Sequence, residues 1–252
     1  ESNKYRLGGS ADTVSTDGGS TSYLYEQGTN LTLHPITDAG LVGYWTFDEG
    51  TGTQALDSSG NNNTGTLTNG PTWQQANNCK TGGCLSFDGV DDNVDLGTPI
   101  ILRNISNGSF SLSAWMKTSD NTGRGAIIGS FGSYPCVNFE VYMTGNMRYW
   151  NGNGSSTDDL VGYAGDLRNG IWHYVTMVRD RNSSLGKIYV DGLLDRSSSI
   201  SVPDGVIASN IRIGSDNRLI ADITHNGFID DVRIYNRALS AVEILSIYNA
   251  TR

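Results

Sequence analysis

The chain has 252 residues, enough for one large β-domain or two small domains with a sizeable core. It contains 32 glycines and carries a net charge of −9, with no basic cluster to neutralise phosphates, which argues against nucleic-acid binding. No run of about 18 apolar residues occurs, so we expect no membrane span in this sequence. Glu1 opens the sequence without a signal-peptide pattern, and we expect a mature or truncated chain.

Residues 1–39 differ in composition from the rest. They are rich in Gly, Ser and Thr, with short apolar pieces at 23–25 and 31–33. Such a segment cannot form a core of its own. We therefore predict an N-terminal extension and linker over residues 1–39, followed by a main domain over residues 40–252.

From residue 41 onward the sequence is almost purely β. Apolar and β-branched residues alternate, or form short runs, between turn residues. The predicted strands are 41–47, 65–67, 71–73, 84–87, 93–96, 110–117, 126–131, 137–144, 146–150, 170–180, 187–190, 193–194, 211–213 and 228–235. About a dozen short strands separated by turn signals predict an all-β fold, a two-sheet antiparallel jelly-roll sandwich.

Two local patterns refine this prediction. In 110–117, Phe110, Leu112, Ala114 and Met116 share one face and Trp115 lies on the other. Strands 187–190 and 193–194 are joined by Asp-Gly, the two-residue signal of a type I′ hairpin.

The last segment is predicted to close the sandwich. Strand 228–235 alternates apolar and polar residues. Ser240 with Glu243 then forms a capping box for a helix over 241–248. We expect this strand and short helix to close the domain against residues 40–50.

The sequence has three cysteines. Cys79 and Cys84 enclose a Lys-Thr-Gly-Gly turn, which favours a disulfide and hence a location outside the cytoplasm. A zinc site is the weaker alternative, because no second cysteine pair lies nearby. Cys136 is expected to pack as a small buried residue.

Six motifs in series carry a family resemblance. They are GLVGYWTFDEG at 40–50, CLSFDGVDDNVDLG at 84–97, SFSLSAWMKT at 109–118, GIWHYVTMVRD at 170–180, GKIYVDGLL at 186–194 and GFIDDVRIYNRALSAVEI at 227–244. Residues 40–248 thus resemble the laminin-G-like jelly-roll domains of the concanavalin A-like lectin/glucanase superfamily. That family includes carbohydrate-binding modules, adhesin domains and accessory domains of glycosidases and lyases. Residues 1–36 are faintly similar to bacterial type IV pilin-like proteins.

The resemblance implies a structural calcium ion between the first strand and the closing strand. It favours Asp48 and Asp230, with Asp57 and its preceding loop contributing; from alternation alone, Asp231 competes with Asp230. Without a metal, these acids would cap turns. Asp88, Asp91 and Asp92 form a third acidic group, which is too short for an EF-hand loop and is interpreted as a turn.

A carbohydrate surface is predicted around the sequence RYWNGN at 148–153, because aromatic rings stack on sugar faces and neighbouring polar groups bind hydroxyls. The predicted ligand-binding residues are Tyr134, Tyr142, Arg148, Tyr149, Trp150 and Asn151. The alternative is that Trp150 packs into the rim of the core. Trp45, Trp115 and Trp172 are assigned to the core, and residues 158–159 to a solvated loop.

The sequence does not predict catalysis. Glycosidases need two carboxylates at a defined separation, and Glu140 has no acid at alternate positions. His173 and Tyr174 are adjacent in a strand and point to opposite faces.

We therefore predict a non-catalytic, calcium-stabilised, carbohydrate-binding or adhesin-like module, extracellular or on a cell surface, with a glycan or cell-surface polysaccharide as partner. One alternative is a pilin-like filament subunit that contacts other such subunits and carries a lectin-like domain. A weaker one is an accessory domain of a polysaccharide-degrading enzyme.

Overall fold

The computed structural model describes residues 38–202, 205–219 and 222–252, and the backbone of four short strands before them. The chain divides into two units, Glu1–Asp38 and Ala39–Arg252. In the first unit, β1 (Tyr5–Arg6) pairs with β2 (Thr13–Val14), and β3 (Tyr23–Leu24) pairs with β4 (His34–Pro35). The rest of the predicted extension lies outside the described residues.

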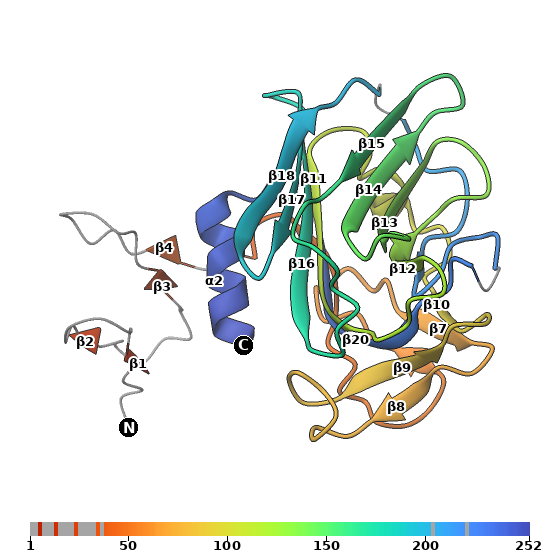
Figure 1. The fold of residues 1–252 in the computed structure, drawn as a ribbon, viewed down its shortest axis with the longest axis vertical. Coiled ribbons are helices and arrows are strands. Elements are labelled where there is room, and N and C mark those ends of the chain that lie inside the picture. Colours follow the sequence, from red (N-terminus) through yellow and green to blue (C-terminus); the bar gives the residue numbers. More distant parts are fainter. Residues whose placement is uncertain are drawn as a thin grey trace. The chain divides into compact units, whose positions relative to one another are not determined.

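The second unit is a sandwich of two antiparallel sheets, as predicted (Figure 1). The sheet that we call the β13 sheet contains, in spatial order, β15 (Thr157–Val161), β14 (Met147–Gly152), β13 (Cys136–Val141), β12 (Gly125–Gly129), β19 (Arg212–Ile213), β10 (Asn93–Asp95), β7 (Gly65–Thr68) and β6 (Gln54–Ala55). The facing β11 sheet contains β18 (Leu193–Ser199), β17 (Leu185–Val190), β16 (His173–Asp180), β11 (Phe110–Lys117), β20 (Asn226–Tyr235), β9 (Cys84–Asp88) and β8 (Thr72–Gln74), with β5 (Leu41–Trp45) also on β20.

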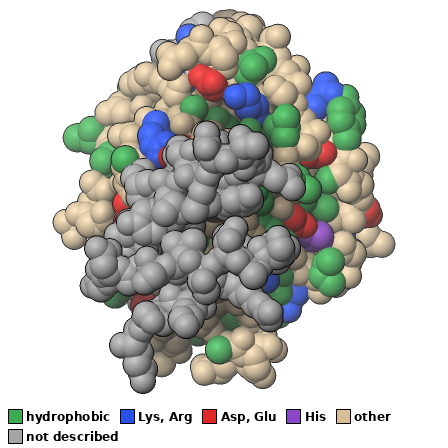
Figure 2. Space-filling view, turned by 90° about the vertical axis from the view of Figure 1, so that its left-hand side faces the viewer, with side chains coloured by type: hydrophobic (Ala, Val, Ile, Leu, Met, Phe, Trp, Pro, Cys, Tyr) green, Lys and Arg blue, Asp and Glu red, His purple; other side chains and the backbone are tan. Residues whose placement is uncertain are grey.

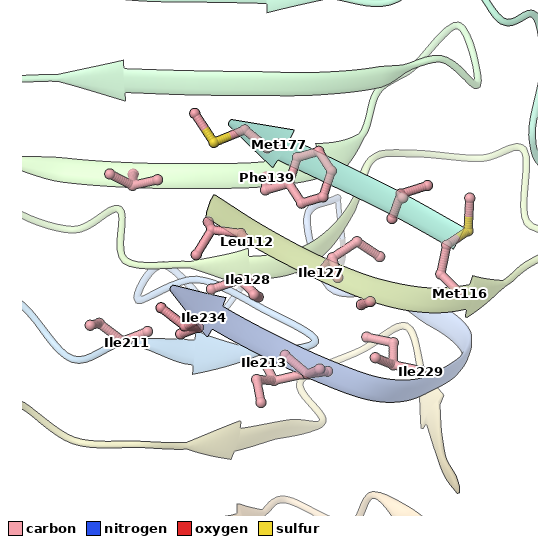
Figure 3. Packing of buried hydrophobic residues seen from close by; sticks show 14 of the residues in the cluster. Leu112, Met116, Ile127, Ile128, Phe139, Met177, Ile211, Ile213, Ile229 and Ile234 are labelled. Carbon is pink, nitrogen blue, oxygen red and sulfur yellow. The ribbon is translucent and has the colours of Figure 1, made fainter. Parts of the chain in front are cut away.

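The core lies between the two sheets, because every second residue of each inner strand points inward. Figure 3 shows apolar side chains of β11, β16 and β20 packed against those of the β13 sheet. The labelled residues are Leu112, Met116, Met177, Ile229 and Ile234 on one side and Ile127, Ile128, Phe139, Ile211 and Ile213 on the other. Burying one such side chain contributes roughly 1.5–3 kcal/mol, so these strands have a fixed inner and outer face.

The closing segment forms as predicted. β20 pairs with β9 through its first half and with β5 through its second half, so it joins the start of the domain to its end. α2 (Ala241–Thr251) begins at a capping box in which Ser240 accepts from the Glu243 amide and Glu243 accepts from the Ser240 amide. On the outer face of β11, the Trp115 indole packs against Tyr248 of α2 and donates to Thr251 at 2.8 Å.

Three further local predictions are confirmed. Cys79 and Cys84 form a disulfide, and Cys136 is free and buried. Asp191 and Gly192 both have positive φ, 51° and 80°, as a type I′ turn requires.

Three predictions were wrong. A one-turn helix, α1 (Ile100–Arg103), follows Pro99, whereas no helix was expected before the C-terminus. Residues 158–159 lie in edge strand β15 and not in a loop. Backbone pairing with β14 forms this strand, although its polar sequence does not indicate one. Trp172 is half-buried, packed on Phe228 at 6.2 Å, instead of lying in the core.

No helix among the described residues has the length and apolar character needed to cross a membrane. On the coloured part of the face in Figure 2, Lys and Arg side chains stand apart from one another among acidic and apolar groups. This distribution agrees with the acidic net charge and offers no continuous basic surface there.

Candidate functional site

Trp150 lies on the outer face of the β13 sheet. In β14, Met147 and Tyr149 point into the core and are fully buried, whereas Arg148 and Trp150 are half-buried on the opposite face. Gly152, two residues further, lies under the indole: a Cβ there would come within 2.6 Å of Trp150 Cη2. The indole thus lies along the strand over Gly152, where any larger side chain would collide with it.

Two aromatic rings from the loop between β12 and β13 pack against Trp150. Phe131 meets Trp150 edge-on, with centroids 5.1 Å apart, and Tyr134 lies 6.2 Å from Trp150 at a tilt of 46°. Tyr134 is 45% exposed, which is high for so large an apolar ring. We call Phe131, Tyr134 and Trp150 the aromatic cluster. Tyr134 is the exposed ring of the cluster, and Phe131 and Trp150 are half-buried.

One side of the aromatic cluster is fixed by a buried acid. Asp216 is fully buried and accepts from Asn138 Nδ2 at 2.9 Å. It also pairs with Arg218, whose guanidinium stacks over Phe131 at 4.2 Å. Since the cation lies over the ring face, this contact holds Phe131 in place and puts hydrogen-bond donors beside the aromatic cluster.

On the other side of the aromatic cluster, Arg148 links two acids. Its Nε and Nη2 bind Asp159 at 2.8 and 2.7 Å, and its Nη1 binds Glu140 at 3.1 Å. Glu140, 1% exposed, also pairs with Arg124 at 3.3 Å. Burial raises the pKa of Glu140 and the two guanidiniums oppose that rise; the pKa ends above its ordinary value. Charged and amide groups therefore flank the aromatic cluster on both sides.

The structure divides the predicted ligand-binding residues. Tyr134, Arg148 and Trp150 are brought together on the outer face. Tyr142 is half-buried beneath Arg148, with its ring 4.6 Å from the guanidinium. Tyr149 and Asn151 are 0% and 2% exposed because strand alternation turns both away from that face, so we leave them out of the candidate surface.

Four residues of this surface were missed from sequence: Phe131, Asn138, Asp216 and Arg218. Asn138 carried a usable signal, because it alternates with Glu140 on β13. The loop that contains Asp216 and Arg218 shows no such signal in the sequence. Its position beside the aromatic cluster depends on the hydrogen bond between Asn138 and Asp216, which are 78 residues apart in the chain.

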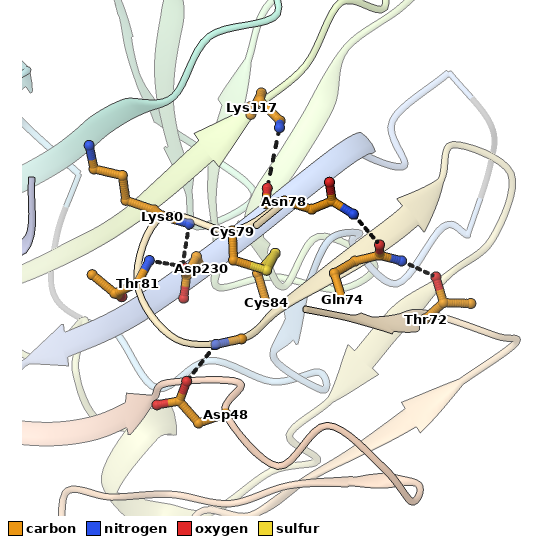
Figure 4. Close-up of a disulfide and its surroundings, with 11 residues drawn as sticks. Asp48, Thr72, Gln74, Asn78, Cys79, Lys80, Thr81, Cys84, Lys117 and Asp230 are labelled. Carbon is orange, nitrogen blue, oxygen red and sulfur yellow. Dashed lines mark hydrogen bonds between the residues drawn. A yellow bond between two sulfur atoms is a disulfide. The ribbon is translucent and has the colours of Figure 1, made fainter. Parts of the chain in front are cut away.

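The predicted calcium residues Asp48 and Asp230 lie on either side of the disulfide loop (Figure 4). Asp230 Oδ2 accepts from the amides of Lys80 and Thr81, at 3.1 and 3.0 Å, and Asp48 Oδ1 accepts from the Gly83 amide at 2.6 Å. Asp230 is fully buried, and among the described residues its Oδ1 has no hydrogen-bond partner. Burial, with the charges of Asp231 and Asp48, raises the pKa of Asp230 to about 7. Each carboxylate thus keeps one oxygen that accepts nothing from the described residues.

Asp57 is not suited to be a calcium ligand. Its Oδ1 accepts from the amides of Tyr44 and Ser59, and its Oδ2 from the amide and side chain of Asn63. These four bonds fill the four lone-pair positions of a carboxylate. Although burial acts to raise the pKa of Asp57, the hydrogen bonds from Asn63, Ser59 and Tyr44 lower it below its ordinary value.

Asp231 is also engaged by protein groups. Its Oδ1 accepts from the Tyr44 hydroxyl at 2.7 Å and pairs with Arg233 at 3.4 Å, and its Oδ2 accepts from Thr81 Oγ1. Because a guanidinium already neutralises this carboxylate, a second cation is disfavoured there. The residues present therefore reduce the predicted calcium set to Asp48 and Asp230.

The third acidic group forms a turn. Asp88 Oδ1 accepts from the Val90 amide, and Asp92 Oδ2 accepts from the Asp88 amide, at 2.8 and 2.9 Å. In the described part of the chain, Asp88, Asp91 and Asp92 are the three acids whose oxygens lie within 4.8 Å of one another. These hydrogen bonds are those of a side-chain-capped turn.

A family model described as the concanavalin A-like lectin/glucanases superfamily matches residues 88–245, more than half of the chain. The chain belongs to this superfamily. The family therefore agrees with the resemblance of the six motifs and with the observed sandwich.

Similar proteins include one from Clostridium botulinum and two of known structure. The non-toxic nonhemagglutinin type A of Clostridium botulinum is 25% identical over 167 residues, which span 65% of this chain and 13% of that protein. The binding domain of Paraclostridial Mosquitocidal Protein 1 superposes with a TM-score of 0.67 at 16% identity, covering 84% of this chain and 52% of that one. A Trypanosoma rangeli sialidase superposes with a TM-score of 0.61 at 18% identity, covering 85% of this chain and 33% of that one. These similarities show the fold, and this chain spans only part of each relative.

Proposed function

We propose that the domain is a non-catalytic, extracellular carbohydrate-binding module. The observation that carries this proposal is the aromatic cluster on the outer face of the β13 sheet, with the exposed Tyr134 and the half-buried Trp150 between the Arg148–Asp159 pair and Arg218. Aromatic rings supply apolar faces for sugar rings, and neighbouring charged and amide groups hydrogen-bond hydroxyls. Apolar and aromatic side chains with a small number of fixed polar groups are the usual lining of a small-ligand site.

Further support comes from the relatives and from cysteine chemistry. The Paraclostridial structure is titled a binding domain, and a botulinum neurotoxin DC binding domain, similar at a TM-score of 0.63, was solved with rat synaptotagmin II. The Cys79–Cys84 disulfide favours an oxidising compartment. These points support a binding role outside the cytoplasm, and the aromatic cluster leads us to infer a cell-surface glycan or a polysaccharide as the partner class.

A glycan array tests the proposal. We expect the wild-type domain to bind a defined set of glycans and Trp150→Ala to lose at least about tenfold in affinity, because it removes the central ring. Trp73→Ala is the matched control: Trp73 is also half-buried, but lies on edge strand β8 of the other sheet. If no glycan binds, or if Trp150→Ala binds as well as wild type, the proposal is wrong.

Calcium remains a proposal of its own. We propose that Asp48 and Asp230 hold a calcium ion beside the disulfide loop, each through the carboxylate oxygen that the loop amides leave free. Hard carboxylate oxygens are ligands that calcium prefers, and a cation there would offset the burial of Asp230. The ion would stabilise the join between the first strand and β20.

Chelation tests this ion directly. We expect EDTA to lower the unfolding temperature, calcium to restore it, and Asp48→Asn to remove both effects. Asp88→Asn, a substitution in the acidic turn, should respond to EDTA like wild type. An unfolding temperature that EDTA leaves unchanged would remove calcium from the account.

The accessory-domain alternative is favoured by one observation. The sialidase contains this fold over about a third of its chain, so a fold of this kind occurs within a glycosidase. Under that alternative the same aromatic cluster would bind the polysaccharide that a neighbouring catalytic domain cleaves.

A further inference from the structure

The outer face of the β13 sheet carries a further aromatic ring, that of Tyr142, beyond the aromatic cluster. Alternate residues of β13 belong to the core, namely Val137, Phe139 and Val141. The positions between them, and Tyr142 after them, therefore face outward. The Tyr142 amide donates to the Asn146 carbonyl at 2.8 Å, so the pairing of β13 with β14 continues to this residue. Its ring lies 4.6 Å from the guanidinium of Arg148, which faces the same side.

The rings of Trp150 and Tyr142 are well separated along this face. Trp150 lies opposite Asn138, and Tyr142 comes four positions after Asn138 in β13. Four strand positions span about 13 Å. The indole lies over Gly152, on the side away from Tyr142, and so does not shorten this separation. A pyranose ring with single bonds of about 1.5 Å is only about 3 Å across, so one sugar cannot contact both rings.

The Arg148–Asp159 pair lies between the two rings. Arg148 uses three of its five N–H groups in hydrogen bonds, two to Asp159 and one to Glu140. Asp159 accepts only these two bonds from the described residues, which leaves two of its four lone-pair positions unused. The pair thus offers both donors and acceptors, and a sugar hydroxyl can use either, because it donates and accepts as well.

The charges along this path favour a neutral ligand. Glu140 pairs with Arg124 and Arg148, and Arg148 also pairs with Asp159, so two guanidiniums face two carboxylates. The Asp159 side chain is 45% exposed and that of Arg148 only 12%. An anionic ligand would therefore meet the more exposed group of the pair as a like charge.

We infer that the outer face of the β13 sheet binds a linear, neutral oligosaccharide with one unit on Trp150, another on Tyr142, and hydroxyls of a middle unit on the Arg148–Asp159 pair. This inference rests on the proposed carbohydrate-binding function and adds to it the length and the charge of the ligand. A pyranose ring and its glycosidic oxygen advance roughly 5 Å, so about three or four units reach from one ring to the other. Contacts at both ends of one ligand reinforce each other, because the second forms within a complex that already exists.

Oligosaccharides of two lengths test the inference. The probes are maltose and maltotetraose, cellobiose and cellotetraose, and diacetylchitobiose and tetraacetylchitotetraose, titrated calorimetrically. In at least one series we expect the tetrasaccharide to bind wild type at least about tenfold more tightly than the disaccharide. Tyr142→Ala should bring the tetrasaccharide close to the affinity of the disaccharide and leave the disaccharide unchanged. Trp150→Ala should weaken both.

Two further variants separate ring contact from a structural role of Tyr142. Tyr142→Phe keeps the ring and should bind like wild type. Tyr163→Ala is the matched control and should also bind like wild type: the Tyr163 ring is 69% exposed and lies 4.4 Å from the guanidinium of Arg196, on β18 of the other sheet. Equal losses of disaccharide and tetrasaccharide affinity in Tyr142→Ala would mean that Tyr142 only supports Arg148, and would overturn the inference.

Thermal unfolding checks that each variant folds. If Tyr142→Ala does not fold, the length dependence of wild type and the resonances of the Tyr142 ring on adding the tetrasaccharide decide the question. Unmoved resonances then overturn the inference.

The outcomes separate the two proposals. A disaccharide and a tetrasaccharide that bind equally, or a glycan array whose ligands are all acidic or do not include the linear tetrasaccharides, overturn the inference and leave the proposed function intact. Binding that is unaffected by Trp150→Ala overturns the proposed function, and the inference with it. An empty glycan array overturns both.

Discussion

The region around β5 and the Cys79–Cys84 loop, which we call the disulfide side, and the outer face of the β13 sheet use their acidic residues in different ways. On the disulfide side, acids are bound mainly by backbone amides: Asp57 accepts from four N–H donors, one of them the Tyr44 amide of β5, and Asp48 and Asp230 accept from the disulfide loop. Around Trp150, charged side chains pair with one another, Arg148 with Asp159 and Arg218 with Asp216, and the Tyr134 ring beside them is 45% exposed. Acids bound by backbone amides hold loops and strands in place, whereas charged side chains beside an exposed ring are placed to contact a ligand.

This contrast leads to a general expectation. Variants on the disulfide side change the free energy of unfolding and leave sugar binding unchanged, and variants on the outer face do the reverse. The most damaging result for the contrast is a folded disulfide-side variant that no longer binds glycan.

The largest effect is expected for Asp57→Ala. The substitution removes an acceptor from four N–H donors and leaves partly buried amides unpaired, so the free energy of unfolding should fall by about 3 kcal/mol in urea titrations. Asp91→Ala is the control, since no described residue hydrogen-bonds its carboxylate, and its effect should be close to zero. Equal losses in the two variants would contradict the role assigned to Asp57.

Removing the disulfide should have the next largest effect. Replacing Cys79 and Cys84 together by Ser opens a short loop, which lowers the free energy of unfolding by about 2 kcal/mol through chain entropy. It also loosens the amides that bind Asp48 and Asp230. Reduction of the wild-type protein should reproduce the loss, with glycan binding retained at temperatures well below unfolding. A stability unchanged by reduction would show that the loop is held by other contacts.

The buried imidazole of His225 predicts that the stability of the domain depends on pH. The folded-state pKa of His225, about 4, lies below its ordinary value of 6.5, so the folded protein binds fewer protons than the unfolded chain. Its contribution to stability is therefore complete above pH 6.5 and is lost as the pH falls toward 4. Between pH 7 and 5 the loss should be roughly 2 kcal/mol, measured as the difference between wild type and His225→Gln. Parallel pH profiles for the two proteins would show that His225 is paired or accessible.

The smallest effect is expected for Asp159→Asn on the outer face. Asp159 is exposed and pairs with Arg148, and such surface pairs contribute less than about 1 kcal/mol to stability. Glycan affinity should change more than stability, because freeing Arg148 alters the edge of the aromatic cluster. A loss of stability larger than that of the disulfide variant would contradict the contrast between the two regions.

Much of the fold followed from local sequence patterns. Alternation in 228–235, the spacing of Ser240 and Glu243, Asp-Gly at the hairpin and the short Cys79–Cys84 interval each correspond to an observed element. These features depend on residues a few positions apart, whose geometry the backbone period or a tight turn dictates. The edge strand β15 and the one-turn helix α1 escaped prediction, because partners elsewhere or a single proline define them.

The site was predicted only in outline. The sequence by itself determined the β-sandwich, its closing strand and an aromatic segment around Trp150. Only the tertiary structure decided that Tyr149 and Asn151 face inward, that Asp57 is filled by amides, and that Asp216 and Arg218 reach Phe131. Exposure and hydrogen-bond occupancy depend on which distant segments pack together: the Gly83 amide lies 35 residues from Asp48, and Lys80 lies 150 from Asp230. A local pattern does not carry that information, because the same strand could turn either face to the core until the second sheet covers one of them.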